Sequence, residues 1–173
     1  MPILDELPLE KLTPVRLWGT LDPETRTVAA RALYDPDWED VAARMEAEMA
    51  IATAVRFRRE AVRRMPLEKR VRYLANAVRP EESLAGALLR ALHLGARSEM
   101  LGRFLDSLGI PQQNGVIESD DGLEPPARPA LEQAAASLRE SYPAADVELY
   151  LATLLAFEPE FWGELVGLLR SEA

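Results

Sequence analysis

Apolar side chains recur at spacings of three and four along most of the chain, which is the period of an amphipathic α-helix. The alternating pattern of β-branched residues that marks a strand is nearly absent. Proline residues divide the pattern into segments, because proline breaks a helix from within. The sequence therefore predicts an all-α fold, a compact array of about eight helices at residues 23–34, 37–64, 67–78, 81–92, 98–108, 130–141, 144–157 and 160–170.

Local signals mark several of the expected helix ends. Asp22 is a preferred N-cap residue, Pro23 suits the first helical position, and Glu24 complements the helix dipole. Gly109 follows an apolar pattern and suits the left-handed conformation that ends many helices. We therefore expect one helix to begin at residue 23 and another to end just before Gly109.

The segment 37–64 is the longest uninterrupted helical pattern in the chain. Between Val41 and Val55 it carries alanine, methionine, isoleucine and valine on nearly every side. A helix that is apolar all round is usually buried. The sequence therefore predicts a long, buried central helix that Pro66 brings to an end.

The chain contains a weak internal similarity. Residues 34–38 and residues 157–161 lie 123 positions apart, and both read aromatic, acid, proline, acid, aromatic. Residues 80–102 resemble residues 143–163 at an offset of 61 to 63, which is about half of that distance. These matches favour three stacked αα-hairpins, at 22–64, 80–108 and 143–170, forming a short right-handed superhelix. The alternative is that any two helices joined through a proline converge on such a sequence.

Helical periodicity stops between residues 109 and 129, where four prolines and three glycines fall close together. A structureless stretch of this length inside a domain is usually functional or flexible. We therefore expect a single all-helical domain, 1–173, in which an acidic loop at 110–128 separates helices within 22–108 from a C-terminal helical part at 129–171.

Composition narrows the class of protein. The 173 residues suit one domain, and the absence of cysteine excludes disulfides and thiolate chemistry. The net charge of −9 comes from residues 110–173, which hold 3 basic and 12 acidic side chains, whereas residues 1–109 hold 17 of each. An acidic protein of this kind is not expected to bind nucleic acid as a whole.

The N-terminal sequence has acidic residues and lacks the basic start and apolar core of a secretory signal. No stretch approaches the 18 uncharged apolar residues that a membrane span requires. The sequence therefore predicts a cytoplasmic protein that does not associate with membranes.

The strongest charged feature is a basic ridge that carries a charge of +6 over 17 residues once Glu60 and Glu68 are subtracted. It comprises Arg56, Arg58, Arg59, Arg63, Arg64, Lys69, Arg70 and Arg72. On a helical wheel Arg56, Arg59 and Arg63 fall on one edge, with Arg64 nearby, opposite an apolar arc that includes Phe57. We therefore assign Phe57 to the core. Such a ridge suits phosphates or an acidic partner. The alternative is a solvated face, or one neutralised by the acids of residues 118–124 and the C-terminal helices.

Two further residues are candidates for binding. Arg58 falls inside the apolar arc of the same wheel, so it either reaches out to solvent or pairs with a buried carboxylate. Trp18 precedes the first expected helix, and an exposed tryptophan would be an interface anchor, although tryptophan is more often a core residue.

Catalytic and metal-binding patterns are not found. His93 is the only histidine, and its place near a helix end suits a partner for the helix dipole. The sequence has no phosphate-binding glycine loop and no nucleophile elbow. We therefore expect no enzyme activity, no cofactor and no metal.

Three hypotheses for function follow. The preferred one is a non-enzymatic helical scaffold or adaptor that binds another protein through a groove between helix hairpins. The first alternative is a regulator that contacts nucleic acid or another polyanion through the basic ridge. The second is a helical protein that binds a small molecule, and self-association into a homo-oligomer is open under all three.

Overall fold

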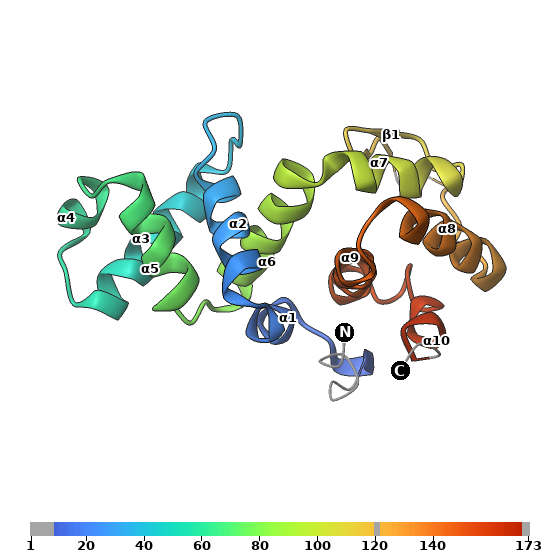
Figure 1. The fold of residues 1–173 in the computed structure, drawn as a ribbon, viewed down its shortest axis with the longest axis horizontal. Helices are drawn as coiled ribbons and strands as arrows, with labels where there is room; N and C mark the ends of the chain where they lie inside the picture. Colours follow the sequence, from blue (N-terminus) through green and yellow to red (C-terminus); the bar gives the residue numbers. More distant parts are fainter. Residues whose placement is uncertain (1–8, 120–121, 171–173) are drawn as a thin grey trace. The chain divides into compact units, whose positions relative to one another are not determined.

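Helices supply almost all of the regular structure, as the sequence predicts. The structure is a computed structural model that describes residues 9–119 and 122–170 (Figure 1). Ten α-helices lie within those ranges. The only strands there are β1 (Gln112–Gln113) and β2 (Val116–Ile117), so the all-α prediction is confirmed.

The helices follow one another along the chain with short connections. They are α1 (Pro14–Thr20), α2 (Pro23–Leu33), α3 (Val41–Val55), α4 (Arg59–Arg63), α5 (Leu67–Asn76), α6 (Glu82–Arg90), α7 (Ser98–Ser107), α8 (Arg128–Ser141), α9 (Ala144–Phe157) and α10 (Leu165–Arg170). A 3-10 turn, η1 (Leu9–Lys11), precedes α1, and α6 continues into a π-helical turn, η2 (Ala91–Ala96). Neither η1 nor α1 is predicted by the sequence pattern.

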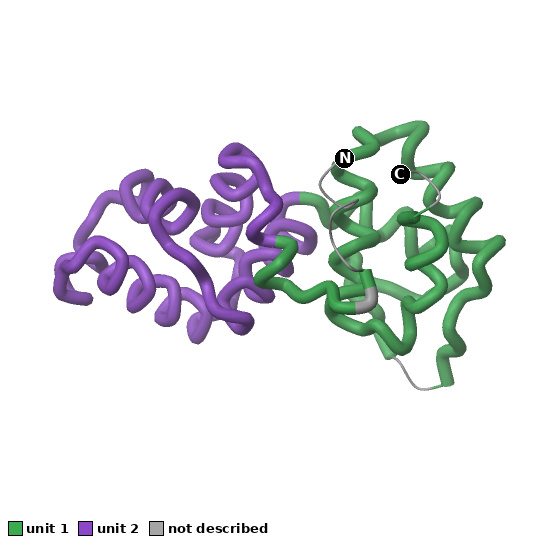
Figure 2. Tube along the Cα trace, turned by 90° about the horizontal axis from the view of Figure 1, so that it is seen from below, with its two compact units in different colours: residues 1–17, 97–173 green, residues 18–96 purple. Residues whose placement is uncertain are grey.

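Contacts divide the chain into two compact units (Figure 2). Unit 2 is residues 18–96, and unit 1 combines residues 1–17 with residues 97–173. The boundary near residue 96 lies before the segment 110–128 that the sequence predicts as a separator. A single domain over residues 1–173 stays a prediction.

Unit 2 is built around α2, which packs against α5, α6 and η2. The Asp22 carboxylate accepts a hydrogen bond of 2.9 Å from the Thr25 amide, so the predicted N-cap is confirmed. The core-facing residues Ala29, Ala30 and Leu33 are fully buried. The small side chains of Ala29 and Ala30 let the neighbouring helices approach α2 closely, so α2 lies at the centre of the unit.

The predicted helix over residues 37–64 is wrong. The structure divides it into α3 and α4, and the chain turns between them at Arg56, whose φ of 55° lies in the left-handed region. The Phe57 amide donates to the Ala52 carbonyl at 2.9 Å, and the Arg56 amide donates to that of Thr53. This is the Schellman arrangement that ends a helix, formed here without glycine.

The prediction that this segment is buried on all sides is also wrong. Only Ala43, Ala47 and Ile51 of α3 are buried, and they form one line of residues four apart. The other apolar residues of α3 are partly or fully exposed. Apolar content on every side of the helix does not tell which side the fold covers.

Unit 1 has an aromatic centre. The Phe104 ring of α7 meets the Tyr150 ring of α9 edge to face, with 5.4 Å between centroids, and lies 6.0 Å from the Trp162 ring. An ion pair of 2.8 Å joins Arg97 to Asp146 at the start of α9. The helices α8, α9 and α10 pack on one another, and α7 packs on α8.

Part of the predicted loop over residues 110–128 has regular structure. Strands β1 and β2 pair antiparallel, with Gln112 opposite Ile117 and Gln113 opposite Val116. Asn114 and Gly115 form the turn, both with positive φ, as an Asn-Gly hairpin requires. A Cβ on Gly115 would lie 2.7 Å from the Leu101 Cβ, so glycine is also needed for close packing on α7. The loop prediction is corrected for these residues.

The two similar five-residue segments both lie at joints between helices. Residues 34–38 follow α2 and lead toward α3, and residues 157–161 end α9 and lead toward α10. Gly109 ends α7 with a φ of 69°, while the Ile110 amide donates to the Leu105 carbonyl. The joints and this C-cap are confirmed, whereas the stacked-hairpin superhelix stays a prediction.

Candidate functional site

An apolar stripe lies on the exposed face of α3. Val41, Met45 and Met49 are 65%, 46% and 56% exposed, respectively. Because they are four residues apart, they follow one another along one side of the helix. We call these three residues the α3 stripe; it runs along the side away from the buried line of Ala43, Ala47 and Ile51.

Exposed apolar residues are ordinary when scattered, but a line of three on one helix is a feature of interaction surfaces. Methionine side chains are flexible and polarisable, so they adapt to the shape of a partner. The described residues leave the stripe exposed, so covering it would require a further element or a partner. The stripe is therefore the strongest apolar candidate for binding in unit 2.

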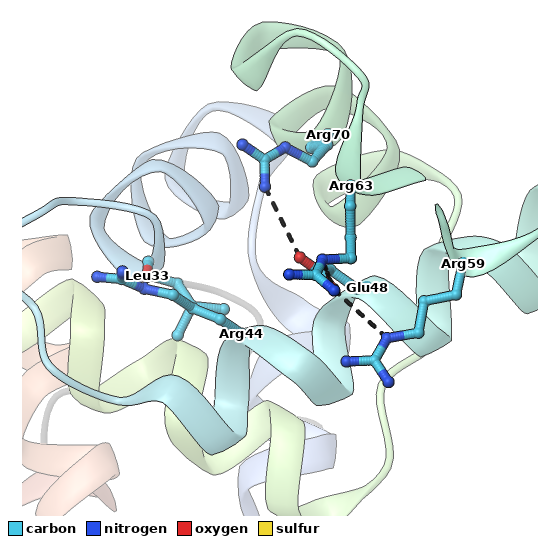
Figure 3. Close-up of polar contacts among 6 residues, drawn as sticks. All are labelled: Leu33, Arg44, Glu48, Arg59, Arg63 and Arg70. Atoms are coloured by element: carbon cyan, nitrogen blue, oxygen red, sulfur yellow. Dashed lines mark hydrogen bonds and ion pairs between the residues drawn. The ribbon is translucent and has the colours of Figure 1, made fainter. Parts of the chain in front are cut away.

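Beside the stripe, three arginines converge on one carboxylate (Figure 3). Glu48 of α3 lies 3.5 Å from the Arg59 Nε, 3.7 Å from the Arg63 Nε and 4.0 Å from an Arg70 Nη. The Glu48 side chain is only 12% exposed, whereas that of Arg63 is 65% exposed. We call Arg59, Arg63 and Arg70 the arginine cluster.

Helix geometry places the cluster at the edge of the stripe. Glu48 is three residues after Met45, and residues three apart are neighbours on a helix surface. The arginines reach Glu48 from α4 and α5, so the cluster is assembled by three elements. The sequence prediction placed Arg59 and Arg63 on one edge of a helical wheel, but that wheel does not apply because the helix ends at Arg56.

Three other arginines of the predicted ridge lie outside the cluster. Arg56, Arg58 and Arg64 are exposed, and none of them has an ion-pair partner among the residues that the structure describes. Arg58 occupies the N-cap position of α4 in extended conformation. The exposure of Arg58 agrees with the alternative in which its side chain reaches out to solvent. The core assignment of Phe57, which is 47% exposed, is wrong.

Arg70 connects the cluster to a buried tyrosine. Its guanidinium stands 4.7 Å from the centre of the Tyr34 ring. Burial raises the pKa of Tyr34 to about 12, while the positive charge of Arg70 opposes that rise. Neither the Tyr34 hydroxyl nor the Arg70 Nε, both buried, has a hydrogen-bond partner in the described part of the chain.

Arg44 is a structural residue that the sequence prediction missed. Its guanidinium donates to the Leu33 carbonyl at 2.9 Å (Figure 3). It also donates to the carbonyls of Asp35 and Trp38. It therefore fixes the joint between α2 and α3 and sets the direction of α3. The only signal in the sequence is an arginine within the first turns of a mostly apolar helix.

The predicted interface candidate Trp18 and the single histidine, His93, are both buried. Trp18 is 3% exposed, with the Arg26 guanidinium 5.8 Å from its ring, so it does not provide a surface anchor. His93 is buried in the π-helical turn η2. Arg26 also donates to the carbonyls of Trp18 and Gly19, which ties α2 to the end of α1.

Open hollows mark the surface of unit 2. One lies between α2 and α5 and is lined by Thr27, Pro66, Lys69 and Arg72, among others. Another lies between α2 and η2, with Trp38 and Leu94 in its lining. Arg58 lines neither of these two hollows, so they do not form the enclosed arginine pocket that a small-molecule site would favour.

Within residues 9–119 and 122–170, no three acidic or histidine side chains gather where they could hold a metal ion. No helix in the same described ranges has both the length and the apolar character needed to cross a membrane. No protein-family model matches the chain, and no curated protein or solved structure gives a significant match to it.

Proposed function

We propose that this chain is a helical adaptor that binds another protein, and that the α3 stripe makes the contact. The observation that carries the proposal is the exposure of Val41, Met45 and Met49 along one side of a single helix. Interfaces are rich in methionine and arginine, and here both lie on adjoining surfaces of α3 and α4. The contact surface proposed is thus a helix face in place of a groove between hairpins.

The stripe is supported by a rigid base. Ala43, Ala47 and Ile51 hold the opposite side of α3 in the core, and Asp40 caps its first turn by accepting from the Ala43 amide at 2.9 Å. Arg44 ties the same end to the preceding joint. A partner would therefore meet a surface that is already ordered, which lowers the entropy cost of binding.

Photo-crosslinking tests the proposal directly. A photoreactive amino acid replaces Met45 in cells that express the chain, and crosslinked proteins are identified and then purified for binding measurements. The double variant Met45→Ser, Met49→Ser should bind such a partner at least about tenfold more weakly, since each tenfold corresponds to about 1.4 kcal/mol. Val116→Ser removes an exposed apolar residue of unit 1 and should leave the affinity unchanged.

Two results would contradict the proposal. One is crosslinking of the chain only to itself, which would indicate a homo-oligomer. The other is a partner that binds the double variant as tightly as it binds the unaltered chain.

A further inference from the structure

The arginine cluster holds more positive charge than its carboxylate neutralises. Three guanidiniums share Glu48, two of them at the same oxygen, over 3.5 to 4.0 Å. By comparison, Arg31 and Glu68 form a two-pronged pair with hydrogen bonds of 2.6 and 2.7 Å. Long contacts to one acceptor leave most guanidinium donors unused, including the buried Arg70 Nε.

Further positive charge surrounds the cluster. The two ends of α4 are capped by Arg58 and Arg64, and Arg56 lies just before this helix. Glu60 is the only acidic residue from 56 to 64. No described carboxylate lies within ion-pair distance of these three arginines. The segment that carries Arg59 and Arg63 therefore adds positive charge next to the cluster.

We infer that the arginine cluster receives carboxylate side chains of an acidic, amphipathic protein segment whose apolar residues lie on the α3 stripe. The inference rests on the proposed function and specifies the chemistry of its partner. Charge complementarity selects the occupant, since the arginines of α4 and α5 meet α3 at Glu48, beside the apolar line of Val41, Met45 and Met49. A partner helix with apolar residues at spacings of three and four, and glutamates along one edge, matches both.

Glu48 acts in this scheme as an internal carboxylate that positions the guanidiniums before the partner arrives. Guanidinium groups held in place lose less entropy when they bind a carboxylate. Arg63 is the most accessible of the three cluster side chains. The partner's first carboxylate is therefore expected to meet Arg63.

Nucleic acid is the competing occupant of a basic surface, and Phe57 is exposed between Arg56 and Arg58 where a base could stack. However, unit 2 holds thirteen basic and twelve acidic residues, and the chain as a whole carries −9. Polyanion binding depends on accumulated positive charge, which this chain lacks beyond one patch. Nucleic acid also makes no use of three exposed apolar side chains in a line.

Two designed helical peptides of about 20 residues serve as probes. Both carry leucines at spacings of three and four; one has glutamates along one edge, and the other has glutamines at the same positions. Binding to the full chain is measured by fluorescence anisotropy. The acidic peptide should bind at least about tenfold more tightly than the glutamine peptide at low salt, and the difference should shrink at about 0.5 M salt, where surface charges are screened.

Variants of the chain show which residues are responsible for the tighter binding of the acidic peptide. Arg63→Glu should abolish the advantage of the acidic peptide, whereas Arg79→Glu makes the same charge change at an exposed residue between α5 and α6 and should retain it. Met45→Ser with Met49→Ser should weaken both peptides. Arg63 is an exposed surface residue, so its substitution leaves the fold intact, which circular dichroism verifies.

The outcomes separate the inference from the proposed function. Equal binding of both peptides, weakened by the stripe variant, overturns the inference and supports the proposed function. Absence of binding by either peptide at about 1 mM overturns the inference, and the proposed function then depends on the crosslinking result alone. A single-stranded oligonucleotide that displaces the acidic peptide, and that depends on Arg63 but not on Met45 and Met49, overturns it in favour of nucleic acid.

Discussion

Two residues in unit 2 each make polar contacts with three partners. Arg44 supplies donors to three backbone carbonyls at the α2–α3 joint. Glu48, one turn later, forms ion pairs with three guanidiniums. Tyr34, in contrast, is buried beneath Arg70 with a hydroxyl that finds no hydrogen-bond partner within the described residues. Substitutions of Glu48 and Tyr34 should therefore change the free energy of unfolding by different amounts.

Glu48→Gln keeps the shape of the side chain and removes the charge on which three arginines converge. Loss of a largely buried carboxylate, together with repulsion among the guanidiniums, should lower the free energy of unfolding by about 1–3 kcal/mol. Urea unfolding followed by circular dichroism measures the change. Glu68→Gln breaks the exposed pair with Arg31 and should leave the unfolding midpoint nearly unchanged. Equal effects of the two substitutions would contradict this account.

Tyr34→Phe should be tolerated at neutral pH, because it removes a buried hydroxyl that has no described partner. Burial raises the pKa of Tyr34 to about 12, above its value of about 10 in an unfolded chain. The stability that this contributes is complete below about pH 10 and is lost as the pH rises through about 12. Phenylalanine cannot ionise, so the variant should lose less stability on going from neutral to strongly alkaline pH.

Urea midpoints at about pH 7 and about pH 11, in both proteins, check the prediction for Tyr34. Burial also raises the pKa of Tyr150 in unit 1, so some alkaline loss should persist in the variant. An identical loss in the two proteins would show that Tyr34 does not contribute to it.

At the scale of elements, the break between α3 and α4 decides where the basic side chains lie. If residues 37–64 formed one helix, Arg59 and Arg63 would continue along its surface, away from Glu48. Instead the chain turns at Arg56, and α4 lies where Arg59 and Arg63 both reach the Glu48 carboxylate (Figure 3). The turn thus creates the cluster from residues that a straight helix would separate.

Arg56→Gly tests the conformation of this turn. A non-glycine residue in the left-handed region costs roughly 1 kcal/mol, so glycine at a φ of 55° should raise the free energy of unfolding by about that amount. Arg64→Gly removes the same side chain at a residue whose φ is −85°, and it should not stabilise the protein. Thermal unfolding of both variants measures the difference. A stabilisation shared by the two would indicate loss of charge repulsion as the cause.

At the scale of the whole molecule, two compact units divide the charge unequally. Unit 1 holds seven basic and seventeen acidic residues, a net charge of −10, whereas unit 2 has a net charge of +1. Unit 2 is also a continuous stretch of chain with its own buried residues on α2, α3, α5 and α6. These properties are typical of a segment that can fold by itself.

A fragment of residues 18–96 should therefore keep a helical circular dichroism spectrum and unfold cooperatively on heating. A fragment of residues 18–64 lacks α5, α6 and η2, which are the elements that pack on α2, and should be largely unfolded. Spectra of the two purified fragments provide the measurement. A coil spectrum for residues 18–96 would show that unit 2 requires unit 1.

Much of the helical structure is determined by local sequence. The Asp22 cap, the proline joints and the Gly109 C-cap act within a few residues, and the structure has all of them. The candidate surface was predicted only in part. Arg59, Arg63 and Arg70 were identified as basic candidates, but their partner Glu48 and the adjoining α3 stripe were not, because both depend on which side of α3 is covered.

The sequence by itself determined that this protein is helical and where most helices start and end, since capping and periodicity are local properties. The tertiary structure alone decided that Ala43, Ala47 and Ile51 face the core while Val41, Met45 and Met49 do not. Both lines of α3 are apolar and have the same spacing, so nothing local distinguishes them. Packing against α5 and α6 selects one line, and the other is left as the surface on which the proposed function depends.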